Sequence, residues 1–239
     1  MERKDEAMND RATLQESSRR DAKRLLRLAR TGALATLDGT APLTTLIGVA
    51  SDWDGAPLFL MSELARHTKN LAANPHASLL LTSEGGRGDP LNQPRITLNG
   101  VVRPRAGEDG RERYVRRNPK AKLYANFADF SVRRLDVETV HFNGGFGRAD
   151  PLAAADILTP GDASALAAAE ASLLERTSGL GHAALAKLAG GGPRSVWRAV
   201  GIDAGGIDLA RGGEAARADL PHAVFDPEAW WQALRQLIA

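Results

Sequence analysis

The residues best suited to chemistry in this sequence lie where a short apolar run meets a basic helix. Leu58 to Met61 has the character of a strand, and the segment that follows predicts a helix ending before Asn74-Pro75, because the residue before proline is disfavoured in the α region. The turn that opens this helix carries hydroxyl and cationic side chains, namely Ser62, Arg66, His67, Thr68 and Lys69. Together with the free N–H groups of a helix N-terminus, such side chains can hold a phosphate. The sequence therefore predicts an anion site at this turn.

The same residues also have an interpretation that requires no ligand. The first turn of a helix is often polar because it faces water, and Arg, Lys and Thr are ordinary residues on a short surface helix. The chain has no glycine-rich fingerprint of the Walker or dinucleotide-binding type, which would indicate phosphate binding more specifically. The spacing by itself leaves both interpretations open.

Composition places the chain among ordinary globular proteins. It has 239 residues, of which 43% are hydrophobic, enough for one large domain or two modest ones. The net charge of +2 gives no general attraction to nucleic acid or to a membrane surface. Cysteine is absent, which excludes disulfides, thiolate nucleophiles and cysteine metal sites. A polar N-terminus and the lack of a long apolar run predict a cytoplasmic protein without a membrane span.

The first two thirds of the chain should be rich in strands. We expect a loose, flexible polar leader over residues 1–16 and an amphipathic helix over 17–30. Strands are predicted at 33–37, 42–51, 58–61, 77–81, 95–105 and 130–142, and a helix over 108–127 should break at Asn118-Pro119. Six strands without regular alternation of strand and helix argue for a mostly β protein, an antiparallel six-stranded barrel with flanking helices.

The last third should form a separate small α+β unit. Residues 151–161 have the composition of a linker, so we divide the chain into a barrel domain over 17–150 and a second domain over 162–239. In this second domain the sequence predicts a helix over 162–189 with a break at Ser178-Gly179, and strands at 196–202, 206–210 and 214–220. Asp226-Pro227 should begin the last helix, because Asp is a good N-cap and proline is favoured at the first helical position.

The order of these elements resembles the FMN-binding split-barrel family typified by pyridoxamine phosphate oxidase. The most specific pieces are S-x-L-A-R-H-T-x-N-L from Ser62 with the following Asn74-Pro75, the strand Pro94 to Gly100, and the pairs of segments Asp129-Phe130 and Asn143 to Gly147. The chain from about residue 20 to its end is similar in particular to the haem-utilisation, or HugZ-type, branch. That branch carries a small α+β domain after the barrel.

The resemblance implies a set of cofactor-binding residues. In split barrels the turn after the third strand meets the flavin and the helix start holds its phosphate, positions that Met61, Ser62, Arg66 and His67 occupy here. His67 stands where the oxidases carry lysine, which weakens the charge but keeps a donor. On the second strand, Thr44, Thr45 and Leu46 lie where the oxidases approach the ring and phosphate. Arg95 takes the place of a ring-contacting glutamine, and a cation there would stabilise reduced, anionic flavin. The alternative interpretation is that Arg95 is only a surface residue at a strand end.

The chain also departs from the family pattern. Tyr114 is kept, but Asn118 and Lys122 replace the expected arginine and serine, and the arginine-histidine motif that clamps the substrate in the oxidases is missing from the C-terminal end. Oxidation of vitamin B6 is therefore not expected. The tail histidine that binds haem iron in haem-degrading members is missing as well, and His141 and His182 are the remaining candidates.

The sequence thus predicts a homodimeric FMN-binding protein whose flavin lies between two protomers. An oxidoreductase of the haem-utilisation type follows from the resemblance, with haem binding or haem degradation as its haem-linked form. No residue stands out as a catalytic acid or base, and no metal site is predicted. The alternative is a non-catalytic dimeric binding module that has lost its flavin and acts through its C-terminal domain.

Overall fold

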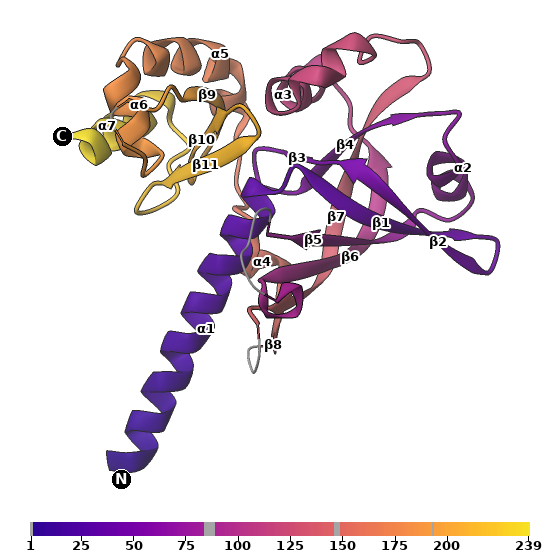
Figure 1. Ribbon diagram of the computed structural model, residues 1–239, viewed down its shortest axis with the longest axis horizontal. Coiled ribbons are helices and arrows are strands. Elements are labelled where there is room, and N and C mark those ends of the chain that lie inside the picture. Colours follow the sequence, from indigo (N-terminus) through magenta and orange to yellow (C-terminus); the bar gives the residue numbers. More distant parts are fainter. Residues whose placement is uncertain (1, 84–88, 146–148, 193) are drawn as a thin grey trace.

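The main body of the protein is one curved antiparallel sheet. A computed structural model describes residues 2–83, 89–145, 149–192 and 194–239, with the backbone alone described at 2–12, 90, 149 and 150. The strand order is β2-β1-β5-β6-β7-β4-β3, with β8 added to β7 (Figure 1). The predicted antiparallel split barrel with a small C-terminal α+β unit is confirmed.

The strands lie close to the predicted segments. Their bounds are β1 Thr31–Asp38, β2 Ala41–Gly48, β3 Ala50–Ser51, β4 Pro57–Ser62, β5 His76–Thr82, β6 Arg95–Pro104, β7 Phe130–Asn143 and β8 Ala149–Leu152. The sequence predicts a single strand over 42–51, but the structure divides this segment at Val49. β2 pairs with β1, whereas β3 pairs with β4, so the chain crosses from one side of the barrel to the other at this point. Val49 is fully buried at the crossing, which explains its apolar character.

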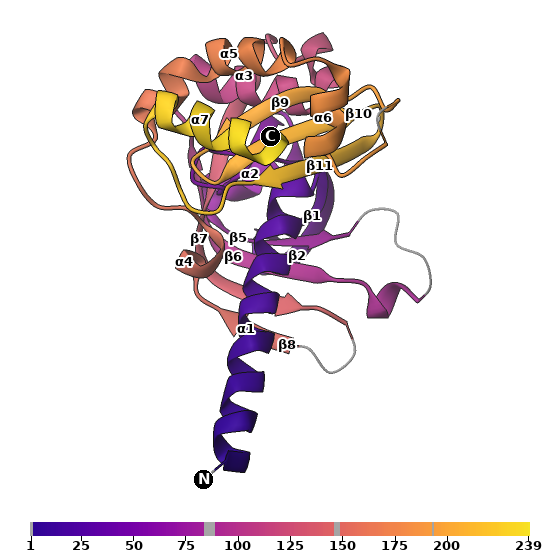
Figure 2. The ribbon, with the colours of Figure 1, turned by 90° about the vertical axis from the view of Figure 1, so that its left-hand side faces the viewer.

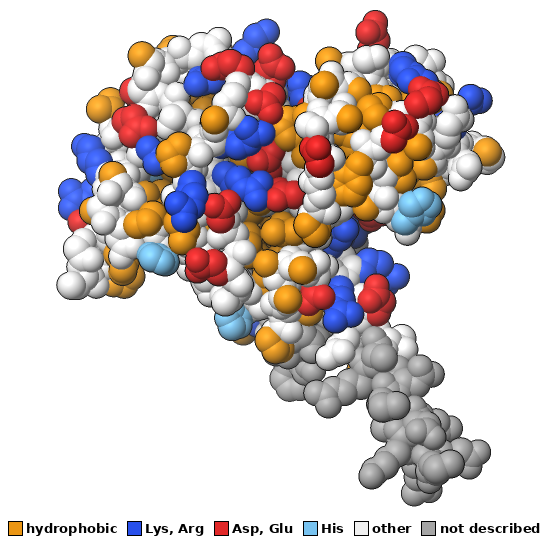
Figure 3. Space-filling view, turned by 180° about the vertical axis from the view of Figure 1, so that it is seen from behind, with side chains coloured by type: hydrophobic (Ala, Val, Ile, Leu, Met, Phe, Trp, Pro, Cys, Tyr) orange, Lys and Arg blue, Asp and Glu red, His pale blue; other side chains and the backbone are white. Residues whose placement is uncertain are grey.

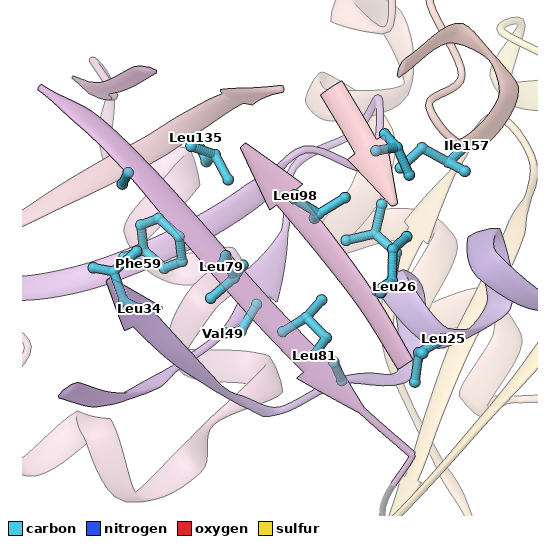
Figure 4. Packing of buried hydrophobic residues seen from close by; sticks show 14 of the residues in the cluster. Leu25, Leu26, Leu34, Val49, Phe59, Leu79, Leu81, Leu98, Leu135 and Ile157 are labelled. Carbon is cyan, nitrogen blue, oxygen red and sulfur yellow. The ribbon is translucent and has the colours of Figure 1, made fainter. Parts of the chain in front are cut away.

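The main core lies between the sheet and the C-terminal half of α1, Glu2–Leu28 (Figure 4). Leu34, Phe59, Leu79 and Leu98 come from four different strands and are fully buried. Leu26 of α1 packs into the same cluster, as the predicted apolar face of residues 17–30 requires. In β1 and β5 burial alternates along the strand, because successive side chains point to opposite faces of the sheet.

The N-terminal half of α1 projects away from the rest of the molecule (Figures 1 and 2). The prediction of a loose leader over residues 1–16 is wrong for the backbone, because the helix begins at Glu2. This stretch is rich in Glu, Arg, Ala, Met and Lys, which have high helix propensity. A polar composition indicated only that the segment lacks a buried face, and a helix can form without one.

Two helical segments lie beside the barrel. α2 spans Arg66–Ala73, and α3 spans Glu108–Arg117; the predicted break at Asn118-Pro119 separates α3 from the 3-10 turn η2, Pro119–Leu123. A second 3-10 turn, η1 at Pro90–Asn92, lies in the loop before β6, where no regular element was expected. Tyr114 of α3 and Ala121 of η2 are buried in a small cluster against β4 and β7. The α3–η2 segment forms one wall of the cavity described below.

The segment predicted as a linker, residues 151–161, is packed structure. It begins with the end of β8 and continues through α4, Ala154–Ile157. Ile157 is fully buried in the main core, and the N–H of Thr159 donates to the carbonyl of Asp54 at 2.8 Å. Its small residues resemble a linker in composition, but the barrel supplies the contacts that order them.

The C-terminal unit packs helices against a three-stranded antiparallel sheet of order β11-β10-β9 (Figure 2). Its elements are α5 Ser164–Ser178, α6 His182–Leu188, β9 Arg198–Asp203, β10 Gly206–Arg211, β11 Glu214–Asp219 and α7 Pro227–Ile238. The predicted helix break at Ser178-Gly179 separates α5 from α6. Asp226 caps α7 as predicted, since its carboxylate accepts the N–H of Ala229 at 2.8 Å. Trp230 is fully buried at the centre of this unit's own core.

A buried charge cluster joins α1 to the C-terminal sheet. Asp203 accepts a hydrogen bond from Arg27 at 2.8 Å and two from Arg217, both at 2.8 Å, and all three side chains are fully buried. Arg217 also donates to Asp208 at 2.9 Å. Burial would raise the pKa of Asp203, but the charges of Arg217 and Arg27 hold that pKa well below its ordinary value. The carboxylate therefore stays ionised and fixes the C-terminal unit against the end of α1.

Charges of both signs are mixed over the surface. On the face shown in Figure 3, Lys and Arg side chains lie among Asp and Glu side chains between the two lobes. Many charged side chains are paired with one another; Arg134 donates to Asp52, Asp54 and Asp136. In the part of the chain that the structure describes, no helix has the length and apolar character needed to cross a membrane.

Candidate functional site

A cavity of about 670 Å³ opens beside the barrel, between the sheet and the α3–η2 segment. Its walls come from β2, the end of β4, the start of α2 and the α3–η2 segment, and include Leu46, Ile47, Met61, Ser62, His67, Tyr114 and Lys120. Arg30 and Lys120 bring positive charge to it, while no carboxylate side chain lines it among the residues that the structure describes. A negatively charged occupant is therefore electrostatically favoured.

The start of α2 faces this cavity without a side-chain cap. The N-cap residue is Ala65, which has no side chain able to accept from the first turn, and both Ala65 and His67 line the cavity. The first N–H groups of a helix have no partner within the helix and carry partial positive charge. This turn can therefore donate backbone hydrogen bonds to an anion, as the sequence predicts.

Ser62 stabilises the turn between β4 and α2. Its hydroxyl donates to a carboxylate oxygen of Asp129 at 2.5 Å and accepts the N–H of Leu64 at 3.1 Å. A hydroxyl has a single proton to donate, and Asp129 takes it. Ser62 lines the cavity but, in this arrangement, shapes the turn rather than offering a hydroxyl donor to a ligand.

His67 and Thr45 come together at one end of the cavity. The Thr45 hydroxyl lies 3.2 Å from Nδ1 of His67, which links β2 to the first turn of α2. Burial lowers the pKa of His67, because the charged imidazolium is poorly solvated there. The ring is therefore neutral near pH 7 and has one N–H donor and one acceptor.

The structure places Arg66 outside the cavity wall. Its guanidinium donates to the two carboxylate oxygens of Asp38 at 2.9 and 2.7 Å, and its side chain is 65% exposed. Asp38 ends β1, so this ion pair joins the start of α2 to the β1–β2 hairpin. The predicted phosphate contact requires Arg66 to leave Asp38 and turn toward the cavity. Such an exchange is inexpensive, because exposed ion pairs contribute little.

The remaining predicted residues divide between the cavity and its surroundings. Met61 is buried and lines the cavity, and Leu46 lines it with a side chain that is 78% exposed. Thr44 is exposed next to Leu46 on the edge strand β2 and does not line the cavity. Arg95, at the start of β6, donates to the carbonyls of Leu91 and Gln93 at 2.7 and 3.4 Å and does not line it either.

Tyr114 is the most informative residue that the predicted site omits. This residue is 97% buried, yet it lines the cavity. A Cβ atom built at Gly48 would lie only 2.2 Å from this hydroxyl, so glycine is needed on β2 for the ring to reach the cavity. Burial raises the pKa of Tyr114, which keeps the phenol protonated as a donor. The sequence shows Tyr114 as a retained family residue, but nothing in its spacing indicates where the hydroxyl points.

Other contributors come from segments far apart in the sequence. Tyr124 and Phe130 line the cavity with ring centroids 5.0 Å apart, and an aromatic pair of this kind can pack against a flat ligand. Arg30 lies between α1 and β1, and Gly212 comes from the turn between β10 and β11. Neither belongs to a recognisable motif, so only the folded chain brings them to the site.

The sequence profile of pyridoxamine 5'-phosphate oxidase matches residues 19–144, more than half of the chain. The chain belongs to this family. The matched range contains every residue that lines the cavity except Gly212. The pyridoxamine 5'-phosphate oxidase fold thus supplies the barrel wall of the cavity, and the C-terminal unit supplies one further contact.

Three proteins with recognisable similarity to this member of the pyridoxamine 5'-phosphate oxidase family are informative. The crystal structure of the protein Atu2129 of Agrobacterium tumefaciens, of unknown function, has a TM-score of 0.78 and 33% identity and covers 92% of this chain and 94% of that one. A heme binding protein from Mycobacterium smegmatis has a TM-score of 0.55 and 26% identity, with 92% and 96% covered. The chloroplastic non-canonical heme oxygenase HOZ of Arabidopsis thaliana is 35% identical over 113 residues, 45% of this chain and 33% of that protein.

Candidate haem ligands are few in this family member. All five histidines are described, and His67 is the one that lines the cavity, whereas His141 and His182 are exposed on β7 and at the start of α6. No group of His, Asp and Glu residues suited to a metal ion occurs in the described part of the chain. Lys120 faces the cavity, while Arg133 is already paired with Glu63.

Proposed function

We propose that this protein binds FMN in the cavity beside the barrel and serves as a redox protein linked to haem. The observation that carries the proposal is the electrostatic character of this cavity in a pyridoxamine 5'-phosphate oxidase barrel. It has an uncapped helix start, two cationic side chains and no carboxylate among the described residues. A phosphate is the kind of group that such a helix start binds.

The residues present suit a flavin phosphate at the His67 end of the cavity. The N–H groups at the start of α2 and the imidazole of His67 would donate to the phosphate, and Arg66 would join them after leaving Asp38. Leu46, Met61 and the aromatic pair would pack against the ring. The flavin supplies the electron or hydride transfer, while this chain binds, orients and shields it.

The proposal includes a homodimer. β2 is an edge strand, and apolar side chains remain exposed on it and on the next two strands of the sheet, β1 and β5: Leu46 is 78% exposed, and Leu37 and Leu80 are each 37% exposed. Exposed apolar groups on adjacent strands are typical of a protein interface. A second copy covering this face would close the open side of the cavity. Arg95 is remote from the cavity of its own protomer, so it would reach a flavin only in the cavity of the second copy.

Absorption spectroscopy of the purified protein tests the proposal directly. A yellow protein with flavin absorption bands, or a colourless one that acquires them when FMN is added, is expected. The Arg66→Ala variant should weaken FMN binding by roughly tenfold, which corresponds to one charge-assisted hydrogen bond. Asp38→Ala should strengthen binding a few-fold, because Arg66 is then free before the ligand arrives. Equal FMN affinity in the wild type and both variants would reject the assignment of Arg66 to the phosphate.

Haem is the second ligand we propose, because similar proteins of known structure or name bind or act on it. His67 is the histidine placed to meet a ligand in the cavity. Titration with haem should give a Soret band that moves in His67→Ala, while His141→Ala and His182→Ala serve as exposed histidine controls. A Soret band unchanged in all three variants would remove these histidines as iron ligands.

A binding module without flavin is the rival proposal, and two contacts favour it. Arg66 is paired with Asp38, and the hydroxyl of Ser62 donates its hydrogen bond to Asp129. Two predicted phosphate donors are therefore engaged within the protein. A colourless protein whose spectrum and melting temperature ignore added FMN would support this alternative. Retention of FMN through gel filtration would exclude it.

A further inference from the structure

One end of the cavity is formed by a residue that the C-terminal unit holds in place. Gly212, in the turn between β10 and β11, lines the cavity together with Arg30. Nη1 of Arg30 donates to the carbonyl of Gly213 at 3.0 Å and to that of Gly212 at 3.5 Å. The turn has a positive φ at Gly212, where glycine is favoured. The β10–β11 turn therefore positions Arg30 in the wall.

Among the residues that the structure describes, no carboxylate is paired with Arg30. Its partners in the described part of the chain are two backbone carbonyls, one of them at the limit of a hydrogen bond. A second cation, Lys120, lines the same cavity. Arg117 lies near Arg30 as well: burial lowers the pKa of Arg117, the charge of Asp208 raises it, and the charge of Arg30 lowers it further. Among the described residues that line the cavity, the charged side chains are thus all cationic.

Tyr114 brings a phenol hydroxyl to the same end. Its hydroxyl lies over Gly48 of β2, and Gly48 is paired with Thr31, the residue after Arg30. Tyr114 is 97% buried and lines the cavity. A protonated phenol at a cavity wall can donate a hydrogen bond to an anion bound there.

The Arg30 end is separate from the His67 end, where the flavin phosphate is proposed. Thr45, which contacts His67, and Gly48, which contacts Tyr114, are three residues apart on β2. At the rise of a strand this corresponds to roughly 10 Å. Apolar side chains such as Ile47 and Met61 line the cavity as well. One phosphate cannot contact both ends.

We propose that Arg30, with Tyr114 and Lys120 beside it, recognises a carboxylate or phosphate group on a second ligand of the cavity. Arg30 is the specificity-determining residue, and the β10–β11 turn presents it, so the C-terminal unit takes part in ligand selection. The proposal rests on the proposed function only in treating the cavity as a ligand site. The anionic group belongs either to haem, as a propionate, or to a small anionic substrate that binds in the same cavity.

The test compares Arg30→Gln with Arg24→Gln in the full-length chain. Arg24 is an exposed arginine on the same helix that lies outside this cavity, so it is the matched control. One arm titrates the wild type and both variants with haem and with haem dimethyl ester, in which the propionates are neutral. The other arm measures the melting temperature and, where FMN binds, the flavin spectrum with inorganic phosphate added at constant ionic strength.

Arg30→Gln should weaken binding of the recognised anion about tenfold, the size of one charge-assisted hydrogen bond, while Arg24→Gln should leave it unchanged. Arg30→Lys, which keeps the charge, should retain part of the binding and controls for a folding defect. Loss of the preference for haem over its ester identifies a propionate, and loss of the phosphate response identifies a small anion. The proposal is overturned if the wild type neither prefers haem to its dimethyl ester nor responds to phosphate. It is also overturned if Arg30→Gln and Arg24→Gln bind these ligands equally well. Failure of FMN binding alone would reject the proposed flavin function and leave this result intact.

Discussion

Replacing Asp203 with alanine should lower the free energy of unfolding by about 3–5 kcal/mol, the usual cost of removing one partner from a buried ion pair. Asp203 bonds Arg27 and Arg217, and all three side chains are fully buried. Without this carboxylate Arg217 still has Asp208, but in the part of the chain that the structure describes Arg27 keeps two neutral oxygen acceptors, each at 3.3 Å. A buried guanidinium would then lack a hydrogen-bonded carboxylate, and this is the origin of the penalty.

Urea and thermal unfolding followed by circular dichroism measure this loss. For a chain of this size it corresponds to a fall in melting temperature of about 6–20 °C. Arg103→Ala is the matched control, because Arg103 pairs with Asp136 at the surface with 66% and 43% of the two side chains exposed. That substitution should cost about 0–1 kcal/mol.

A double substitution separates the buried charge from the lost packing. Arg27→Met with Asp203→Leu removes both charges, so it should cost less than the sum of the two single changes. Acid provides a second check. Because the pKa of Asp203 is lowered in the folded protein, its contribution is complete above the ordinary value of 3.8 and is lost as the pH falls below it. An Asp203→Ala penalty under about 1 kcal/mol, or strict additivity in the cycle, would refute the reasoning.

Three further predictions concern the cavity and the last helix. Gly48→Ala should place a methyl group against the Tyr114 hydroxyl, costing about 1–3 kcal/mol in unfolding free energy and weakening ligands at the Arg30 end; a variant as stable as the wild type would contradict the 2.2 Å approach. Burial lowers the pKa of His67, whereas a bound phosphate beside the ring would raise that pKa. FMN affinity, measured by fluorescence titration, should therefore increase as the pH falls from about 8 to about 6.5 in the wild type, and it should increase less in His67→Asn. Asp226→Ala should remove the cap of α7 and cost about 1 kcal/mol in urea unfolding, and no change would show that the cap is dispensable.

The fold was predictable where a local pattern had one physical solution. Asn74-Pro75 ends α2, Asp226-Pro227 begins α7, and apolar alternation indicates most of the strands. The prediction was wrong where local composition had more than one solution. Residues 151–161 look like a linker, yet they contain α4 and the buried Ile157, because the barrel surface offers them contacts that the sequence does not display.

The candidate site was predictable only in part. The resemblance led to Met61, Ser62 and His67, which do line the cavity, and to Thr45, which contacts His67. It also led to Arg66, which pairs with Asp38 in the structure, because two opposite charges within reach pair when no ligand is present. The role of Arg66 in phosphate binding stays a prediction.

The sequence by itself determined the family, the antiparallel barrel and the polar turn at the start of α2, because each depends on residues that are neighbours along the chain. Only the tertiary structure decided that Arg30, Tyr114 and a turn around Gly212 share one cavity. These residues are separated by long stretches of chain, and their meeting depends on how the buried Arg27–Asp203–Arg217 cluster sets the C-terminal unit against α1. A contact of that kind is fixed by packing and by the cost of burying charge, which no local pattern encodes.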